Sequence, residues 1–140
     1  MTEPPAIGSI VDYPYLWRRE RDAGETERRK VRPACLVVSV TGASGEHLIG
    51  LVPITSQRPV GVRAIEVPQL ELARAGLSHE RRAWVIVSEL NTDVLERSWY
   101  GLPSEPRGAF GPKFLDRVLA GVERAPLQGG RRHRPPGLTG

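Results

Sequence analysis

The chain has 140 residues, a mass of 15.4 kDa and a formal net charge of +4, which is the size of a single domain. It contains no run near the ~20 apolar residues that span a bilayer, and its N-terminus lacks the basic and apolar stretches of a secretory signal. The single cysteine, Cys35, excludes an intrachain disulfide and a cysteine-based metal cluster. We therefore expect a cytoplasmic protein without membrane association, in which Cys35 is a small core residue.

The net positive charge is concentrated at the C-terminus. Residues 124–140 contain four arginines and no acid, which leaves 16 of the 20 basic residues against 16 acidic residues in the rest of the chain. The same segment contains a Gly-Gly and a Pro-Pro pair, and this composition cannot form a packed core. We therefore predict a folded domain over residues 1–123 and a disordered basic tail over residues 124–140. The tail either adds non-specific affinity for nucleic acid or is a solvated appendage without a function.

Residues 7–17 are predicted to form the first strand, because apolar and aromatic side chains alternate from Val11 to Trp17. Pro14 removes a hydrogen-bond donor, so this strand is expected to lie at a sheet edge or to be bulged there. A highly charged connection over residues 18–31 follows, without apolar periodicity. Structureless connections of this length are uncommon in compact domains and are often functional.

Two apolar runs, residues 34–40 and 47–54, flank a polar turn that contains glycine, and they are predicted to form an antiparallel hairpin. Both runs are apolar at successive positions, which is typical of strands that are buried on both faces. With the turn centred between residues 43 and 44, the numbers of opposed residues sum to 87. The pairs that this register predicts are Leu36 with Leu51, Val38 with Ile49, and Arg32 with Thr55.

The rest of the chain is predicted to add short strands and two helices. The expected elements are a strand over residues 62–67, a helix over 69–75 that begins after Pro68 and ends at Gly76, a buried strand over 83–88 that contains Trp84, an ambiguous segment over 94–100 compatible with a short strand, a Pro/Gly loop over 103–111, and a helix from Pro112 to about residue 123. These elements give a mainly β fold of the α+β class. The architecture that fits them best is a small SH3-like β-barrel with the C-terminal helix outside.

Arg32 and Thr55 are the first candidates for a functional site, since the predicted register brings a guanidinium and a hydroxyl together at the open end of an apolar hairpin. Arginine presents a planar fork to phosphoryl oxygens, and threonine adds a hydroxyl donor. Ser56 and Gln57 follow directly and could supply further donors. The alternative is structural: Arg32 extends from a strand end into solvent, Thr55 caps a turn, and the next two residues only form that turn.

Other chemistry-bearing residues are less informative. Glu27 lies five residues before Arg32 and is either a general base or one of several solvated acids in the charged connection. The histidines, at positions 47, 79 and 133, have no metal-ligand spacing and form no evident acid–base pair, so neither a metal nor another cofactor is expected. Trp84 is assigned to the core, whereas Trp17 and Trp99 could stack on bases or contact a partner.

Four stretches of the chain carry a family resemblance. They are Gly-Ser-Ile-Val at residues 8–11, Arg-Pro-Ala-Cys-Leu-Val-Val-Ser at 32–39, Leu-Val-Pro-Ile-Thr-Ser at 51–56 and, more faintly, Val-Ser-Glu-Leu-Asn at 87–91. The most specific part is an Arg-Pro pair that enters a Val-rich strand and is followed at hairpin spacing by Pro-Ile-Thr-Ser. Together these stretches, over residues 7–92, resemble the MazF/PemK family of toxins from type II toxin–antitoxin systems.

This resemblance implies an SH3-like barrel that forms a homodimer and cleaves single-stranded RNA without a metal ion, leaving 2′,3′-cyclic phosphate and 5′-hydroxyl ends. It implies Arg32 and Thr55 as catalytic residues, Glu27 as a further catalytic residue, and a cognate antitoxin protein as a partner. The residues then expected to bind RNA are Arg28, Arg29, Lys30, Ser56 and Gln57. The chain departs from the family in its long charged connection, in Glu-Leu at residues 89–90 where many members have Asp-Gln, and from about residue 94 onward.

Two other interpretations of the chain stay open. One is a non-catalytic barrel that binds nucleic acid or a protein target such as a topoisomerase. The other is a small partner-binding barrel without any role in nucleic-acid chemistry. The retained Arg32 and Thr55 pair favours the endoribonuclease over both, because a toxin that acts by protein contact has no need of it.

Overall fold

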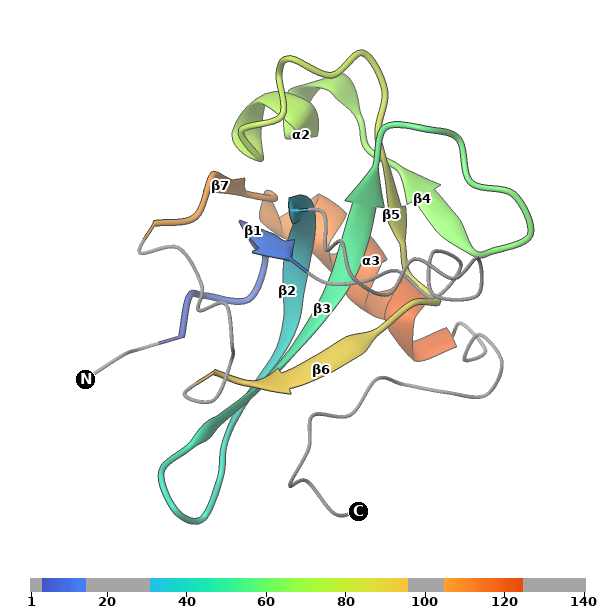
Figure 1. The fold of residues 1–140 in the computed structure, drawn as a ribbon. Helices are drawn as coiled ribbons and strands as arrows, with labels where there is room; N and C mark the ends of the chain where they lie inside the picture. The colour runs from blue at the N-terminus through green and yellow to red at the C-terminus, as the bar shows by residue number, and fades with distance from the viewer. Residues whose placement is uncertain (1–3, 15–30, 96–104, 125–140) are drawn as a thin grey trace.

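A computed structural model describes residues 4–14, 31–95 and 105–124 of the protein. This part of the chain forms seven strands and two helices (Figure 1). They are β1 (Ser9–Pro14), β2 (Val31–Thr41), β3 (His47–Thr55), β4 (Ala64–Glu66), α2 (Gln69–Arg74), β5 (Trp84–Ile86), β6 (Asn91–Val94), β7 (Gly108–Ala109) and α3 (Pro112–Arg124). The strands pair antiparallel in the order β4-β5-β3-β2-β1-β7, and β6 also pairs with β3. The predicted α+β class is therefore confirmed. The sheet formed by the described strands is open between β4 and β7, so closure into a barrel is not confirmed.

The β2–β3 hairpin has the predicted register at its open end and a different register near its turn. Leu36 pairs with Leu51, as predicted, but Val38 pairs with Gly50 instead of Ile49. The ladder contains one extra β2 residue between Leu36 and Val38, which is a β-bulge. Gly50 suits this position, because a Cβ there would lie 3.0 Å from the Cβ of Val38.

The turn itself is centred half a residue later than predicted. Thr41 pairs with His47, so the loop is centred on Ser44, and Gly45 adopts a φ of +86° that glycine tolerates best. The bulge in β2 shifts the pairing by one residue and so restores the predicted register beyond it. The later turn and the bulge, neither of which was predicted, therefore shift the register in opposite directions, and the two shifts cancel at the open end of the hairpin.

The two faces of the sheet contain separate hydrophobic clusters. Alternate residues of β2 and β3 contribute to each cluster, so most of both strands is buried on both sides, as predicted. Near the turn this prediction is wrong, because Val40 is 51% exposed where the hairpin extends away from the rest of the sheet (Figure 1). Cys35 is fully buried, as predicted, and this burial raises the pKa of its thiol to about 12.

The first cluster is covered by both helices. Phe114 and Val118 of α3 and Leu72 of α2 pack with residues of β2, β3 and β5. Helix α3 begins at Pro112, where a missing N–H costs nothing, and runs behind β2 and β3 (Figure 1). The predicted C-terminal helix is therefore confirmed, and it provides the apolar layer against which the sheet is held.

The second cluster is enclosed by curvature of the sheet. Val11 and Tyr13 of β1 pack here with residues of β2 and β3 and with Leu95, which follows β6. The Tyr13 hydroxyl also donates a hydrogen bond to Asp93 of β6. Strands β1 and β6 thus approach each other across this cluster although they do not pair, which gives the sheet a strongly bent shape.

Most of the predicted elements that fall within the described residues are confirmed, with shorter strands for β4 and β5. The two-residue strand β7 lies in the segment predicted to be a Pro/Gly loop. The sequence did not predict it, because a strand of two residues is too short to show an alternation of apolar side chains. β1 pairs with β7 only at Ser9 and Ile10, so no described strand flanks Pro14 on that side, in agreement with the expected edge position. The charged connection and the basic tail fall, except at their ends, in residues 15–30 and 125–140, outside the described residues. No helix in the described ranges is long and apolar enough to cross a membrane.

Candidate functional site

A cavity of about 150 Å³ opens at the end of the β2–β3 hairpin. Its described lining residues come from four separate parts of the chain: Arg32, Pro33, Ile54, Thr55, Ser56, Leu77, His79, Glu80, Ala83 and Arg107. Both of the leading candidates from the sequence, Arg32 and Thr55, are among them. We refer to this site as the Arg32 cavity.

Arg32 and Thr55 reach the cavity from strands that separate at this end of the sheet. Arg32 pairs with Tyr13 of β1, whereas Thr55 pairs with Trp84 of β5. The β2–β3 register ends two residues earlier, at the Ala34–Pro53 pair. Side chains two residues apart on a strand point to the same side, so Arg32 and Thr55 continue the faces of that last pair.

Prolines at this end of both strands provide a local reason for the separation. Pro33 and Pro53 have no backbone N–H, so neither can donate a hydrogen bond to a neighbouring strand. The ladder between β2 and β3 is weakened where these residues come close to facing each other. Strands β2 and β3 therefore pair through apolar residues along most of their length, whereas their pairing is weak at the end that contains the two prolines. The cavity lies at this end.

The Thr55 hydroxyl is buried, with 5% of the residue exposed, and it takes part in the turn after β3. Its Oγ1 accepts a hydrogen bond from the backbone N–H of Gln57 at 3.2 Å. This contact agrees with the structural role foreseen for Thr55 as a turn cap. It uses the oxygen as an acceptor, so the hydroxyl proton can still be donated into the cavity.

His79 and Glu80 enter the cavity because helix α2 ends in a Schellman motif. Gly76 adopts a φ of +72°, and the N–H groups of Gly76 and Leu77 donate to the carbonyls of Ala73 (3.2 Å) and Leu72 (2.8 Å). This geometry buries Leu77 against the core and sends the following turn toward β3. The predicted end of the helix at Gly76 is therefore confirmed, and it decides where the next residues lie.

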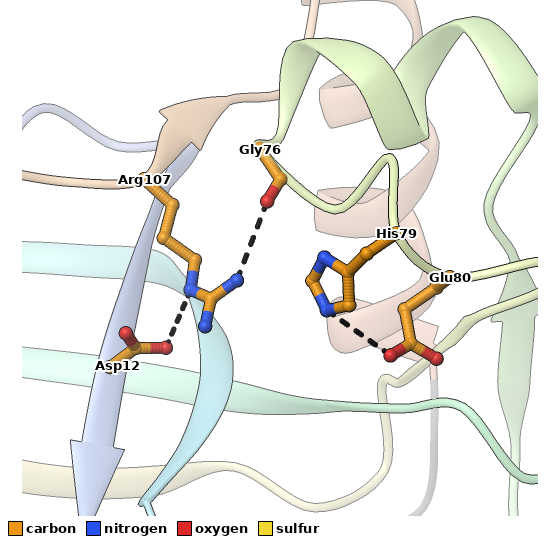
Figure 2. A network of polar contacts seen from close by, with 5 residues as sticks. All are labelled: Asp12, Gly76, His79, Glu80 and Arg107. Carbon is orange, nitrogen blue, oxygen red and sulfur yellow. Dashed lines mark hydrogen bonds and ion pairs between the residues drawn. The ribbon is translucent and has the colours of Figure 1, made fainter.

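The His79 imidazole contacts its neighbour: Nε2 lies 3.2 Å from Oε1 of Glu80 (Figure 2). The side chain of His79 is 59% exposed and that of Glu80 is 30% exposed, so both are in reach of solvent and of a ligand. Sequence inspection missed both residues as site members. Neither has a spacing to Arg32 or Thr55 that predicts contact, because the approach depends on how α2 packs.

Arg107 forms the wall opposite His79 (Figure 2). Its Nε donates to Oδ1 of Asp12 at 2.8 Å, and its NH1 donates to the carbonyl of Gly76 at 3.4 Å. A Cβ at Gly76 would lie 2.5 Å from the Arg107 carbonyl oxygen, so the close approach of these two segments requires glycine. Arg107, like His79 and Glu80, is a charged or polar site residue that the sequence did not indicate.

Trp84, the strand partner of Thr55, is a core residue, as predicted, with 8% exposure. The guanidinium of Arg82 lies 4.9 Å from the centre of its ring and is held by two hydrogen bonds to Glu66. This fork also lowers the pKa of the exposed Glu66 carboxyl. Trp84 therefore does not offer an open stacking face.

The other predicted site residues have mixed outcomes. Ser56 lines the cavity, whereas Gln57 is exposed beside it and contacts the site through its backbone. Glu27, Arg28, Arg29 and Lys30 lie outside the described residues. Over residues 4–14, 31–95 and 105–124, no three His, Cys, Asp or Glu side chains come together as a metal site would require.

A second, larger cavity of about 560 Å³ lies between β4 and α3. It is lined by small and aliphatic residues and by three arginines: Val62, Arg63, Ala64, Ile65, Val87, Arg117, Ala120, Gly121 and Arg124. We refer to it as the β4–α3 groove. Among the described residues it contains no carboxylate, hydroxyl or imidazole.

Comparisons of the chain with models of protein families, with curated proteins and with solved structures give no match.

Proposed function

We propose that the protein is a metal-independent endoribonuclease of the MazF/PemK toxin type, with an SH3-like barrel architecture, which acts as a homodimer on single-stranded RNA and is neutralised by a cognate antitoxin. The observation that supports this proposal best is that Arg32 and Thr55 line one cavity. These two residues carry the most specific part of the sequence resemblance, and they are 23 positions apart in the chain.

The proposed reaction is a transesterification within the RNA. The 2′-oxygen of the ribose attacks the adjacent phosphorus, a cyclic phosphate forms, and the bond from phosphorus to the 5′-oxygen breaks. Arg32 stabilises the negative charge that builds up on the non-bridging oxygens, and the Thr55 hydroxyl donates a hydrogen bond to one of them. Arginine side chains keep their proton over the physiological range, so Arg32 is a poor base.

The size of the Arg32 cavity agrees with capture of one group of the substrate. At about 150 Å³ it is smaller than the roughly 300–1,000 Å³ of pockets that enclose whole drug-sized ligands. A phosphoryl group fits such a volume, and the flanking nucleosides then lie outside it. In this proposal Glu27 removes the 2′-hydroxyl proton, while Arg28, Arg29, Lys30, Ser56 and Gln57 contact the RNA around the cavity.

The test is incubation of the purified chain with a long single-stranded RNA in excess EDTA, followed by mapping of the ends. We expect cuts at discrete positions, with 5′-hydroxyl and 2′,3′-cyclic phosphate ends. An Arg32→Ala preparation made in parallel separates this activity from a contaminating ribonuclease, because only a contaminant cuts equally in both. Intact RNA after incubation with the folded wild-type chain contradicts the proposal and favours a non-catalytic binding protein.

A further inference from the structure

We propose that His79 is the general acid of this site, which protonates the 5′-oxygen as it leaves, and that Glu80 positions its imidazole. The inference rests on the proposed endoribonuclease function and assigns a residue to the donation of a proton to the leaving oxygen. It comes from the placement of His79 and Glu80 in the same cavity as Arg32 and Thr55.

The step needs a proton donor for reasons of balance. When the 2′-oxygen forms its bond to phosphorus, the 2′-hydroxyl proton passes to a base. The electron pair of the breaking phosphorus–oxygen bond goes to the 5′-oxygen, which becomes a strongly basic alkoxide unless it receives a proton. In the proposed step the imidazolium of His79 donates that proton and becomes a neutral imidazole, which recovers a proton from solvent afterwards.

The geometry leaves one ring nitrogen available for this transfer. Nε2 of His79 lies 3.2 Å from the Glu80 carboxylate, so this contact fixes the ring from one side. The other nitrogen, Nδ1, is turned toward the Gly76 and Arg107 side of the cavity (Figure 2). The half-exposed position of the ring gives solvent the access that reprotonation requires.

His79 suits this role better than the other charged groups around it. Glu80 comes from the same turn, Arg107 from the segment before β7, and Arg32 from β2; Asp12 of β1 is held by Arg107. Arginine side chains do not release a proton readily. Histidine is the side chain whose charge changes between about pH 5 and 8, and His79 is the one histidine among the described lining residues.

The test compares two short RNAs that carry one cleavage site mapped with the wild-type chain. One has the natural 5′-oxygen at the scissile bond, and the other has sulfur in its place. A thiolate leaves without protonation, so the sulfur substrate does not need a general acid. Single-turnover cleavage rates are measured for the wild-type chain, for His79→Gln, and for Ser78→Ala as a matched exposed control in the same turn.

We expect His79→Gln to cleave the oxygen substrate about 10²–10⁴-fold more slowly than wild type and the sulfur substrate within a few-fold of it, with Ser78→Ala near wild type on both. Equal losses on both substrates, or no loss on the oxygen substrate, overturn the assignment of His79 but not the proposed function. No cleavage by the wild-type chain overturns the proposed function and the assignment together.

The positioning role of Glu80 has its own readout. Glu80→Ala removes the carboxylate that contacts Nε2 of His79. We therefore expect slower cleavage of the oxygen substrate than by the wild-type chain, with an unchanged rate on the sulfur substrate. A wild-type rate on the oxygen substrate, or equal losses on both substrates, overturns the role of Glu80. Thermal unfolding of each variant shows whether the fold is retained, and the surface positions of both side chains make its loss unexpected.

Discussion

The Arg32 cavity and the β4–α3 groove differ in chemistry as well as in size. The β4–α3 groove is the larger, at about 560 Å³ against 150 Å³, yet its described lining offers only aliphatic surface and guanidinium groups. The Arg32 cavity combines two guanidinium groups with a buried hydroxyl, an imidazole and a carboxylate. Both linings contain guanidinium groups, which can stabilise the charge of a phosphoryl group. Of these two linings, only that of the smaller cavity also contains an imidazole and a carboxylate, which can exchange a proton.

This difference shows that the volume of a cavity does not indicate which chemical groups line it. The groove is formed where a helix and an edge strand pack imperfectly, and its arginines make no ion pair with any described residue. The Arg32 cavity is formed where four segments end close together, so it gathers side chains of different kinds. If the comparison holds, equivalent substitutions in the two cavities have unequal effects on RNA cleavage.

The largest effect is expected for Arg32→Ala set against Arg63→Ala. Loss of a preorganised donor to a developing oxyanion typically costs about 10²–10³-fold in rate, and we expect this loss for Arg32→Ala. Arg63→Ala removes a guanidinium from the groove and leaves its backbone contacts in place, so its rate is expected within twofold of wild type. Initial cleavage rates in EDTA measure both, with far-ultraviolet circular dichroism as the control for folding. Equal losses break the comparison.

Thr55→Val is expected to reduce cleavage at least tenfold, since a hydrogen bond to a charged group contributes about 1.5–3 kcal/mol. Valine has a similar shape, so the change removes the hydroxyl and little volume. Thr55→Ser keeps the hydroxyl and is expected to retain most of the activity. If valine and serine are equally active, Thr55 only caps its turn, and the Arg32 cavity loses one of the two groups that distinguish it.

Gly76→Ala is expected to lower the free energy of unfolding by more than Gly45→Ala does. Both glycines have positive φ, where another residue costs about 1–2 kcal/mol. Only at Gly76 does the added Cβ meet a backbone atom, the Arg107 carbonyl at 2.5 Å, because nothing lies within 4 Å of a Cβ at Gly45. Urea denaturation measures the difference. Equal destabilisation contradicts the close approach that builds the wall of the Arg32 cavity.

The smallest effect is expected for Asp12→Asn. Asp12 and Arg107 form an ion pair at 2.8 Å, but their side chains are 32% and 35% exposed, and pairs of this kind contribute about 0.2–1 kcal/mol. The loss should shrink further in high salt. Asp116→Asn, at an exposed site on α3 without an ion pair to any described residue, is the control. A loss above 2 kcal/mol would mean that Arg107 is held far more rigidly than its exposure indicates.

Part of this site was predictable from the sequence because it depends on local pattern. The apolar runs of β2 and β3 specify a hairpin, and Leu36 opposite Leu51 follows from a turn near residue 44. The sequence predicted that Arg32 and Thr55 lie at the same end of the hairpin, although it predicted neither the turn position nor the bulge. Each of these two features shifts the register, in opposite directions, so the predicted pairing of Leu36 with Leu51 is retained. The direct pairing predicted for Arg32 and Thr55 is wrong, because the β2–β3 ladder ends at Ala34 and Pro53.

The sequence by itself determined the longer elements of this protein but not the short strands β6 and β7. The period of the apolar residues, the glycine after α2 and the proline before α3 act over a few neighbouring positions. The sequence did not determine that His79 and Arg107 belong to the same cavity as Arg32. Their approach depends on the packing of α2 against the segment before β7, over separations of 28 residues and more. Such long-range contacts leave no periodic signal along the chain, because they arise from the shapes of faces that meet only after the sheet has bent. Only the tertiary structure decided that the imidazole of His79 and the guanidinium of Arg32 share one cavity.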